Sequence, residues 1–517
     1  MQRYKILWVD DEIELLKPYV LYLEEKKYIV KTFSDPFSLT DYIQNNTDFD
    51  LVLVDENMPG KTGLNLINDI KINFGIVPII MITKNEEENI MEEAIGSMIS
   101  DYLIKPLNPN QLLISIKKVL ENNSIIKNKL KTDYLNSFNK LSSEINSNNN
   151  FFEWVEIYKK IVNWEISLEK NSDDEYDQIL ISQKKEANKN FSRYIIENYK
   201  LWISNENNRP TMSFDLLKKR IFPSISSKPI FFILIDNFRY DQWKAIENYI
   251  SNYFFIKNDD PYFSILPTTT EYSRNSIFSG LSPLEMSNVE SKLWEDKSNG
   301  LNNNEFDFID NNFKRNNLIV KHSYNKIVSH EDGVKFVKKF SDLLNYNFNS
   351  IVFNFIDMLS HARSENKLFK NLVYDEKSFR SFTLSWLKNS PLNELLKFLS
   401  SKDVIVYLST DHGTVRVEKP VKIKGNKETN NNIRFKHGKN INTNEKSLFI
   451  CDNGEKIKLP RSNIFSKYIF SVENQYLLYP KNYNYHLKNF MNTFQHGGIS
   501  MEEMIIPFIE LSPKLKE

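Results

Sequence analysis

Residues 229–241 read PIFFILIDNFRYD, an uninterrupted apolar run that ends at Asp236. A short apolar run bounded by polar residues predicts a fully buried strand. Two further runs have the same form and are each followed by an aspartate: Ile351–Phe355 and Val404–Leu408, with Asp357 and Asp411. In an open α/β sheet, the ligand site lies beyond the carboxyl ends of the strands. The sequence therefore predicts a sheet that brings three carboxylates to one edge.

Strand-like and helical stretches also alternate in the first 121 residues, which predicts a parallel, doubly wound α/β sheet there. The expected strands are Lys5–Val9, Leu51–Val54, Ile79–Ile82 and Tyr102–Ile104, and the expected helices include Glu12–Lys26 and Leu64–Lys71.

The middle of the chain has a different pattern. Apolar side chains recur there at helical spacing, as in Phe151, Val155, Tyr158, Val162 and Ile166, which predicts an all-helical connector. We therefore expect three parts: residues 1–121, 122–207 and 208–517. Within the last part, the stretches 284–340 and 418–480 are polar and are expected to be irregular, as insertions or a cap over the site.

The bulk composition argues against several classes of protein. Lys plus Arg and Asp plus Glu number 67 each among 517 residues, so no net positive charge favours nucleic acid. The single cysteine, Cys451, excludes an internal disulfide and is typical of a reducing compartment. The first residues become acidic where a signal peptide would be apolar, and the apolar runs are far shorter than the ~20 residues that cross a membrane. We expect a cytoplasmic protein with no membrane insertion.

Polar residues follow the expected strands of the first part: Asp10, Asp11, Asp55, Thr83 and Lys105. If the strands are parallel neighbours, these side chains converge at one edge. Clustered carboxylates repel one another unless a hard cation lies among them, and Mg²⁺ prefers such oxygen ligands. Lys105 and Thr83 are then expected to hold a phosphoryl group on Asp55.

This pattern resembles the receiver domain of bacterial response regulators, which has a flavodoxin-like fold. The resemblance rests on Asp10-Asp11, the run DENMPG from Asp55 to Gly60, Thr83 and Lys105-Pro106. It implies that Asp55 is the phosphoacceptor. It further implies a Mg²⁺ site at Asp10, Asp11, Asp55 and the backbone of Asn57, and switch residues Thr83, Tyr102 and Lys105.

Asp and His residues with the spacing of metal ligands occur in the last part. Asp357 and His361 stand four apart, which places both on one face of an expected helical turn. The full candidate set is Asp236, Asp357, His361, Asp411, His412 and His496, enough for two metal ions. Mixed imidazole and carboxylate ligation favours Zn²⁺, with Mn²⁺ as the alternative. Two such ions bind the attacking and leaving oxygens of a phosphoryl displacement.

A nucleophile is expected nearby, in the run PTTTE at residues 267–271. A threonine hydroxyl loses its proton more easily beside Zn²⁺ and then attacks phosphorus. Composition leaves open which of Thr268, Thr269 and Thr270 acts.

The ordered motifs resemble the alkaline phosphatase superfamily, in particular its phosphodiesterase branch and the PglZ domain. They are Asp236, Pro267 through Thr270 to Gly280, Asp357 with His361, Asp411-His412-Gly413 and His496-Gly497. The resemblance implies an α/β domain with insertions and Thr270 as the nucleophile. It implies one zinc ion at Asp236, Asp411, His412 and Thr270, and a second at Asp357, His361 and His496.

Substrate contacts are expected at Arg274, Arg434, Lys436 and His437. The run RFKHGK at 434–439 either grips phosphate oxygens and stacks on a base or forms a solvated loop, and the sequence leaves both open. His322, His330 and His486 have no motif around them and are expected to be structural.

The domain order resembles a family of response regulators that are associated with the type IX secretion system of Bacteroidota. The resemblance implies a sensor histidine kinase, a phosphorylation-dependent homodimer, and phosphodiesterase action on cyclic or short linear oligonucleotides. It also implies contacts with a secretion-motor protein and a sigma factor. The alternative is a signalling adaptor whose zinc domain binds such partners without catalysis. The complete ligand set with Thr270 favours the enzyme.

Overall fold

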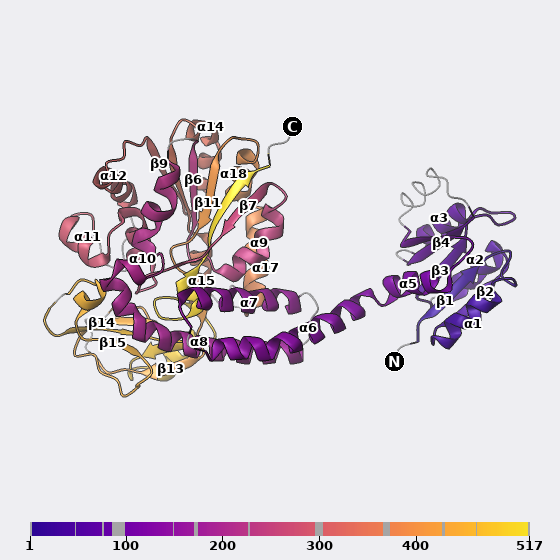
Figure 1. The fold of residues 1–517 in the computed structure, drawn as a ribbon, viewed down its shortest axis with the longest axis horizontal. Helices are drawn as coiled ribbons and strands as arrows, with labels where there is room; N and C mark the ends of the chain where they lie inside the picture. Colours follow the sequence, from indigo (N-terminus) through magenta and orange to yellow (C-terminus); the bar gives the residue numbers. More distant parts are fainter. Residues whose placement is uncertain are drawn as a thin grey trace. The chain divides into compact units, whose positions relative to one another are not determined.

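A computed structural model describes residues 3–46, 48–74, 77–84, 99–147, 149–169, 174–225, 228–294, 303–365, 373–425, 430–461 and 463–514. Among these residues, no helix has both the length and the apolar character needed to cross a membrane. Contacts divide the chain into two compact units, Met1–Tyr134 and Leu135–Glu517 (Figure 1).

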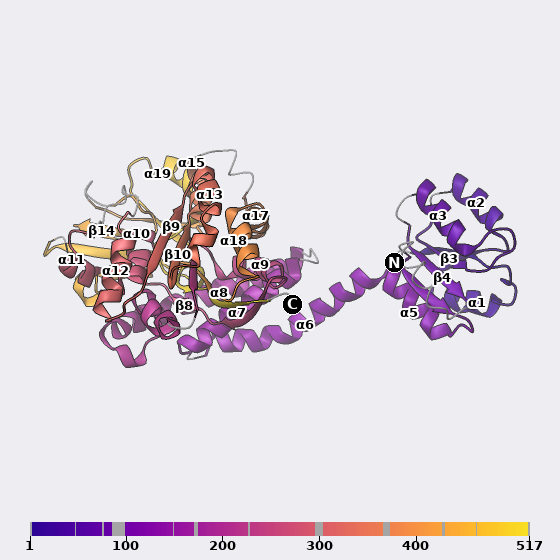
Figure 2. The ribbon, with the colours of Figure 1, turned by 90° about the horizontal axis from the view of Figure 1, so that it is seen from above.

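The first unit is a five-stranded parallel sheet in the order β2-β1-β3-β4-β5. Its strands are β1 (Lys5–Val9), β2 (Ile29–Phe33), β3 (Leu51–Asp55), β4 (Ile79–Thr83) and β5 (Asp101–Ile104). Figure 2 shows α2 (Pro36–Asn45) and α3 (Gly63–Phe74) on one face, and α1 (Lys17–Glu25) and α5 (Pro109–Leu120) on the other. The predicted flavodoxin-like fold is confirmed.

One helix of this unit begins later than predicted. The sequence pattern favoured a helix from Glu12, whereas residues 11–16 form turns and α1 begins at Lys17. Pro18 explains the difference, because proline is favoured in the first turn of a helix but breaks a helix interior.

Three long helices follow: α6 (Asn122–Ile145), α7 (Phe151–Glu169) and α8 (Asp174–Ser204). The division between the two units falls within α6. On α7, the predicted apolar face is buried at Val155, Tyr158 and Val162. The all-helical connector is therefore confirmed, with α7 packed against α8.

The second unit is built on a six-stranded sheet in the order β7-β20-β11-β6-β10-β9. The strands β11, β6, β10 and β9 are parallel, whereas β20 runs antiparallel to both β11 and β7. Their bounds are β6 (Ile230–Ile235), β7 (Phe254–Asp259), β9 (His322–Ile327), β10 (Phe348–Phe353), β11 (Ile405–Ser409) and β20 (Phe508–Pro513). The predicted α/β domain is confirmed as a mixed sheet.

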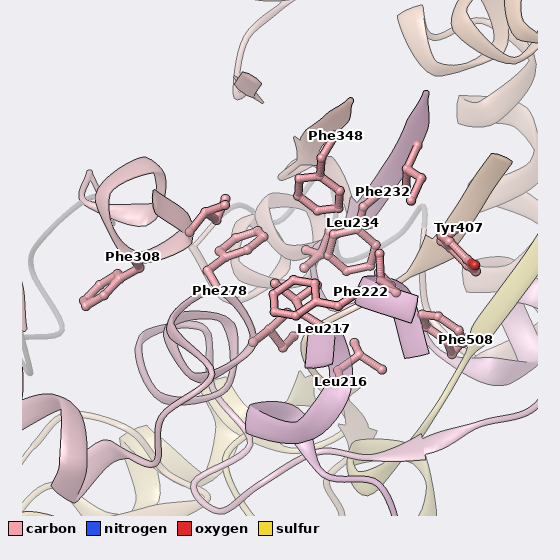
Figure 3. Packing of buried hydrophobic residues seen from close by; sticks show 14 of the residues in the cluster. Leu216, Leu217, Phe222, Phe232, Leu234, Phe278, Phe308, Phe348, Tyr407 and Phe508 are labelled. Carbon is pink, nitrogen blue, oxygen red and sulfur yellow. The ribbon is translucent and has the colours of Figure 1, made fainter. Parts of the chain in front are cut away.

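Helices cover both faces of this sheet. Phe232 and Leu234 of β6 point to one face, where they pack with Phe278 of α10 (Thr270–Ser279) and Phe308 of α12 (Glu305–Arg315) (Figure 3). The opposite side carries α9 (Tyr240–Ile250), α17 (Glu376–Lys388) and α18 (Pro391–Leu399) (Figures 1 and 2). Because both faces are covered, β6 is fully buried and apolar throughout.

Two strands of this unit differ from the prediction. The strand expected at Ile351–Phe355 is β10, which begins three residues earlier, where Phe348 pairs with β6 and β9. It includes the polar residue Asn349, whose buried amide donates to the Leu343 carbonyl. Within 284–340, β9 is a strand of the main sheet rather than an insertion.

The described part of 418–480 is not irregular, since it forms short strands: β13 (Lys419–Lys422), β14 (Phe435–Lys439), β15 (Phe449–Cys451), β16 (Ser466–Phe470) and β17 (Gln475–Leu478). The run at 434–439 is therefore largely a strand, not a solvated loop. The remaining elements are β8 (Tyr262–Phe263), α11 (Pro283–Val289), α13 (His330–Val337), α14 (Phe340–Leu343), α15 (Phe355–Glu365), β12 (Val415–Arg416), α19 (Tyr483–Phe490), β18 (Phe494–Gln495), α20 (Met501–Met504) and β19 (Ile505–Ile506).

Candidate phosphoacceptor site and metal centre

The carboxyl ends of β1 and β3 bring together the acidic residues of the first unit. Carboxylate oxygens of Asp10, Asp11 and Asp55 lie within 4.8 Å of one another. Lys105 Nζ lies 2.8 Å from Asp10 Oδ2 and 2.6 Å from Asp55 Oδ1. Burial raises the pKa of Asp55, although Lys105 opposes this rise. The cluster of oxygens fits a hard divalent cation such as Mg²⁺.

The other predicted residues of this site surround Asp55. The Asn57 backbone N–H donates to Asp55 Oδ2 at 3.0 Å. Thr83 lies at the end of the neighbouring strand, and its hydroxyl donates to the Glu56 carboxylate. Tyr102 is half-buried on β5 and packs on the core beneath α3. The structure therefore brings Lys105 to Asp55, with Thr83 engaged by Glu56.

In the second unit, a group of ligand atoms forms beyond β6 and β11. Ligand atoms of Asp236, Asp411 and His412 lie within 4.8 Å of one another, and all three residues are buried. Thr270, the first residue of α10, joins them: its Oγ1 lies 3.3 Å from Asp236 Oδ1 and 3.2 Å from His412 Nε2. Of the three threonines in the sequence motif, Thr270 therefore has its hydroxyl at this group.

A second group lies beside the first. Asp357 occupies the first turn of α15, and its Oδ1 is 3.5 Å from Nε2 of His496, which follows β18. The rings of His412 and His496 stack with centroids 4.3 Å apart, so the two groups are adjacent. His361 lies one turn further along α15, but its side chain is outside the part of the chain that the structure describes.

Backbone carbonyls orient both of these histidines. His412 Nδ1 lies 3.1 Å from the Gly413 carbonyl, and His496 Nδ1 lies 3.3 Å from the Thr268 carbonyl. A carbonyl oxygen only accepts, so each Nδ1 carries the proton and each Nε2 has a lone pair that can bind a cation held by the neighbouring carboxylates. This tautomer is the one that metal-binding imidazoles use.

Arg274 compensates the buried carboxylates. Its Nε lies 2.9 Å from Asp411 Oδ2, and its Nη2 pairs with Asp236. Burial raises the pKa of Asp236 well above its usual range, against the opposing charge of Arg274. Burial raises the pKa of Asp411 as well. The nearby charges of Arg274 and His412 outweigh this effect and hold the pKa below its usual value. Added positive charge from a divalent cation would stabilise both carboxylates as anions.

Three of the predicted substrate contacts are engaged by other residues of the protein. Arg274 is fully buried and also faces Glu305, so its geometry gives it a structural role. Arg434 is likewise buried, and its Nε and Nη2 donate to Glu503 at 3.1 and 2.6 Å. His437 stacks on Tyr468, with ring centroids 4.1 Å apart.

Glu503 also accepts from the Gly498 backbone N–H at 2.9 Å. The Arg434–Glu503 pair therefore anchors the loop that follows His496. Sequence reasoning missed Glu305 and Glu503, because no local pattern distinguishes a buried carboxylate from a surface one.

Sequence reasoning also missed the role of α8, which supports both loops of the site. The Tyr199 hydroxyl accepts from the Leu266 N–H at 2.8 Å, four residues before Thr270. Earlier on the same helix, Asn188 Oδ1 accepts at 2.8 Å from the N–H of Met501, which follows His496 in the chain. The connector thus contacts the backbone on either side of the metal centre. No local sequence signal marks these contacts.

Comparison with known protein families identifies the family of the second unit and the order of the domains. A model of the BREX system PglZ alkaline phosphatase-like domain matches residues 216–511, more than half of the chain. The chain belongs to the PglZ family. Models of the response regulator receiver domain and of the PorX response regulator linker domain match residues 6–117 and 124–203 of this PglZ protein. This is the order of a PorX-type response regulator, so the predicted architecture is confirmed.

Similar proteins match the receiver end of the PglZ protein. The phosphoglycerate transport system transcriptional regulatory protein PgtA of Salmonella typhimurium is 31% identical over 115 residues, which are 22% of this chain and 28% of that protein. Response regulator RppA of Synechocystis is 31% identical over 114 residues, 22% and 49% of the two chains. The chain thus spans less than half the length of these relatives. The structure of CheY4 from Vibrio cholerae is 28% identical and covers 23% of this chain and 100% of its own, with a TM-score of 0.22.

These findings establish a response regulator with an alkaline phosphatase-like output domain. Metal dependence is typical of alkaline phosphatase-like domains. Receiver domains commonly bind Mg²⁺ and are phosphorylated by sensor histidine kinases.

Proposed function

We propose that the output of this response regulator is a zinc-dependent phosphodiesterase. One observation carries the proposal: the Thr270 hydroxyl lies 3.3 Å from Asp236 Oδ1 and 3.2 Å from His412 Nε2, at the edge of a buried group of ligands. The mixture of imidazole and carboxylate donors favours zinc over magnesium. When bound there, zinc lowers the pKa of a neighbouring hydroxyl and draws in phosphate oxygens.

Each residue of the site has a separate role in this proposal. Asp236, Asp411 and His412 would hold one ion, and Asp357, His496 and His361 the other. The hydrogen bonds from Nδ1 to backbone carbonyls keep both described histidines in the ligating tautomer. Thr270 begins α10, and the partial positive charge at a helix N-terminus stabilises negative charge developing on its Oγ1.

The chemical steps follow from this placement. Thr270 Oγ1 loses its proton to water and attacks phosphorus, and the bond from phosphorus to the opposite ester oxygen breaks. That oxygen takes a proton from water and leaves as an alcohol. A second water then hydrolyses the bond between phosphorus and Thr270 Oγ1, which restores the hydroxyl and releases a phosphate monoester. Substrates would be cyclic or short linear oligonucleotides, each of which carries diester bonds.

A turnover screen tests the proposal. The purified full chain is incubated with cyclic dinucleotides, short oligonucleotides and an aryl phosphodiester, beside a Thr270→Ala variant. We expect zinc-dependent cleavage of at least one diester class by the wild type. Zinc binding without turnover of any diester would contradict the enzyme and favour a signalling adaptor.

We further propose that a sensor histidine kinase phosphorylates Asp55 in the cytoplasm and that the phosphorylated chain forms a symmetric homodimer. A secretion-motor protein and a sigma factor of type IX secretion are the partners in this proposal. A phosphoryl group on Asp55 adds negative charge beside Lys105 and competes with Glu56 for the Thr83 hydroxyl. As Thr83 moves, Tyr102 gains room to turn inward, which repacks the face by which receivers pair.

The dimer switch gives a direct prediction. Asp55→Ala should abolish the doubling of mass on phosphorylation, because no acceptor carboxylate remains, and should leave the zinc content unchanged. Asp41→Ala, an exposed acidic residue of α2, is the matched control and should dimerise normally. Light scattering with and without a small-molecule phosphodonor and Mg²⁺ measures both. An unchanged mass for wild-type protein shown by mass spectrometry to be phosphorylated would refute the switch.

A further inference from the structure

A cavity lies among β14, β17 and α19, and none of the predicted metal ligands lines it. Its volume is about 780 Å³, within the range of roughly 300–1,000 Å³ that ligand pockets occupy. Ile433 and Leu477 form part of an apolar floor, and Tyr479, His486 and Phe490 contribute rings. The cavity is therefore large enough for a flat organic molecule and has surfaces on which such a molecule can stack.

The charge of this cavity is entirely positive among the described residues. Lys424, Lys436 and Lys481 line it, and no Asp or Glu does. Lys424 and Lys481 are exposed. The surface is therefore complementary to an anion.

Lys436 is the unusual member of this set. Its side chain is buried, with 4% of the residue exposed. Its Nζ donates to the Asn430 carbonyl at 2.8 Å and lies 5.1 Å from the centre of the Tyr479 ring. No carboxylate of the described residues lies within ion-pair distance of this ammonium, although the buried arginines of this unit all have one. A buried charge without a counter-ion is costly. A bound anion would remove that cost.

We propose that this cavity binds a mononucleotide unit, with its phosphate at Lys436 and its base against the rings of Tyr479 and Phe490. Aromatic rings that stack on bases and lysines that hold phosphate are the two parts of such a site. The inference rests on the proposed function only in the choice of a nucleotide. One loop connects the cavity with the metal centre: Asn432 lies between the lining residues Asn431 and Ile433 and donates to the His496 carbonyl at 3.1 Å.

Binding measurements test the site. Isothermal titration calorimetry of the zinc-loaded full chain is made with adenosine 5′-monophosphate, inorganic phosphate and adenosine as probes. We expect the monophosphate to bind more tightly than either part. Lys436→Met should weaken this binding by about tenfold or more, the loss expected for a charge-assisted contact. Lys439→Met, at the exposed end of the same strand, removes an equal charge outside the cavity and should bind normally.

Several outcomes would overturn the inference. One is equal affinity of the wild-type chain for inorganic phosphate and for adenosine 5′-monophosphate. Another is an affinity of Lys436→Met for adenosine 5′-monophosphate that equals that of the wild type. If Lys436→Met does not fold, Tyr479→Leu replaces it: stacking predicts a loss of about fivefold or more for the nucleotide and none for phosphate. Nucleotide affinity that is unchanged in Tyr479→Leu would also overturn it. Failure of the proposed function is distinguishable, because a catalytically silent chain would still bind the nucleotide here.

The pH dependence of binding gives an independent readout. Burial lowers the pKa of Lys436 to about 8. Above about pH 6 the phosphate is a dianion and requires the protonated lysine, so the affinity should fall progressively as the pH rises through the pKa of Lys436. Near pH 8, binding should also take up a fraction of a proton, which titrations in buffers of different ionisation enthalpy measure. Both effects should vanish in Lys436→Met. A flat wild-type profile up to pH 9 would contradict phosphate contact with Lys436.

Discussion

Replacing Thr270 by alanine is expected to lower phosphodiester turnover by about 10³-fold or more, and to leave the fold and the bound zinc in place. The reason is that a methyl group supplies no oxygen to attack phosphorus. Asp236 and His412 lie within 3.3 Å of the Thr270 hydroxyl and belong to the same group of ligands. The remaining protein ligands of that group are untouched, so the metal should stay.

The two neighbouring threonines are the matched controls for this variant. Thr269 caps α10 through its backbone, and its side chain makes no capping hydrogen bond, so Thr269→Ala should be much milder. Thr268 Oγ1 accepts from Gly497 N–H and donates to the Gly498 carbonyl, each at 3.0 Å. Thr268→Ala should therefore act through the loop that carries His496. Steady-state turnover of an aryl phosphodiester ranks the three. Near-normal turnover in Thr270→Ala would show that another group is the nucleophile.

The second large effect concerns metal content. The full chain should hold close to two equivalents of zinc, and His412→Gln and Asp357→Asn should each hold close to one. The reason is that His412 belongs to the group with Asp236, whereas Asp357 faces His496. His412 is preferable to Asp411 for this test, since removing Asp411 would also deprive buried Arg274 of a counter-charge.

Elemental analysis measures the zinc content of each variant. His322→Gln is the control, because His322 packs on Phe306 and lies 3.3 Å from Asp310, away from the metal centre. It should keep two equivalents. Two equivalents in both ligand variants would contradict the division of the site into two groups.

The sequence predicted those parts of the site that depend on local order along the chain. Asp236 and Asp411 could be found because each follows a buried apolar strand, and parallel strands end at the same edge of a sheet. Asp10, Asp55 and Lys105 were found for the same reason. These residues do converge in the structure.

The roles of the arginines could not be predicted in this way. Arg274 pairs with Asp411, 137 residues away, and Arg434 pairs with Glu503, 69 residues away. No local sequence pattern separates an arginine that binds phosphate from an arginine in a buried ion pair. Only the fold distinguishes the two. The same limit applies to Tyr199 and Asn188, whose contacts with the site loops depend on how α8 packs.

Short strands were the weakest part of the fold prediction. β9 reads HSYNKI and β14 reads FKHGK, and neither contains an apolar run. Both are strands because neighbouring strands supply their hydrogen bonds, β10 to β9 and β16 to β14. A strand with this many polar residues lacks the apolar pattern from which strands are predicted. The nucleotide cavity lies beside β14, in a stretch expected to be irregular.

The central claim is that the output domain hydrolyses phosphodiesters with zinc, and turnover before and after metal removal tests it most directly. The full chain is assayed on an aryl phosphodiester as isolated, after dialysis against a chelator, and after zinc is returned. The account predicts turnover as isolated, its loss on chelation, and its recovery with zinc, with Thr270→Ala inactive in all three states. Turnover that survives complete removal of the metal, or that zinc fails to restore in chain shown to be folded, would contradict it.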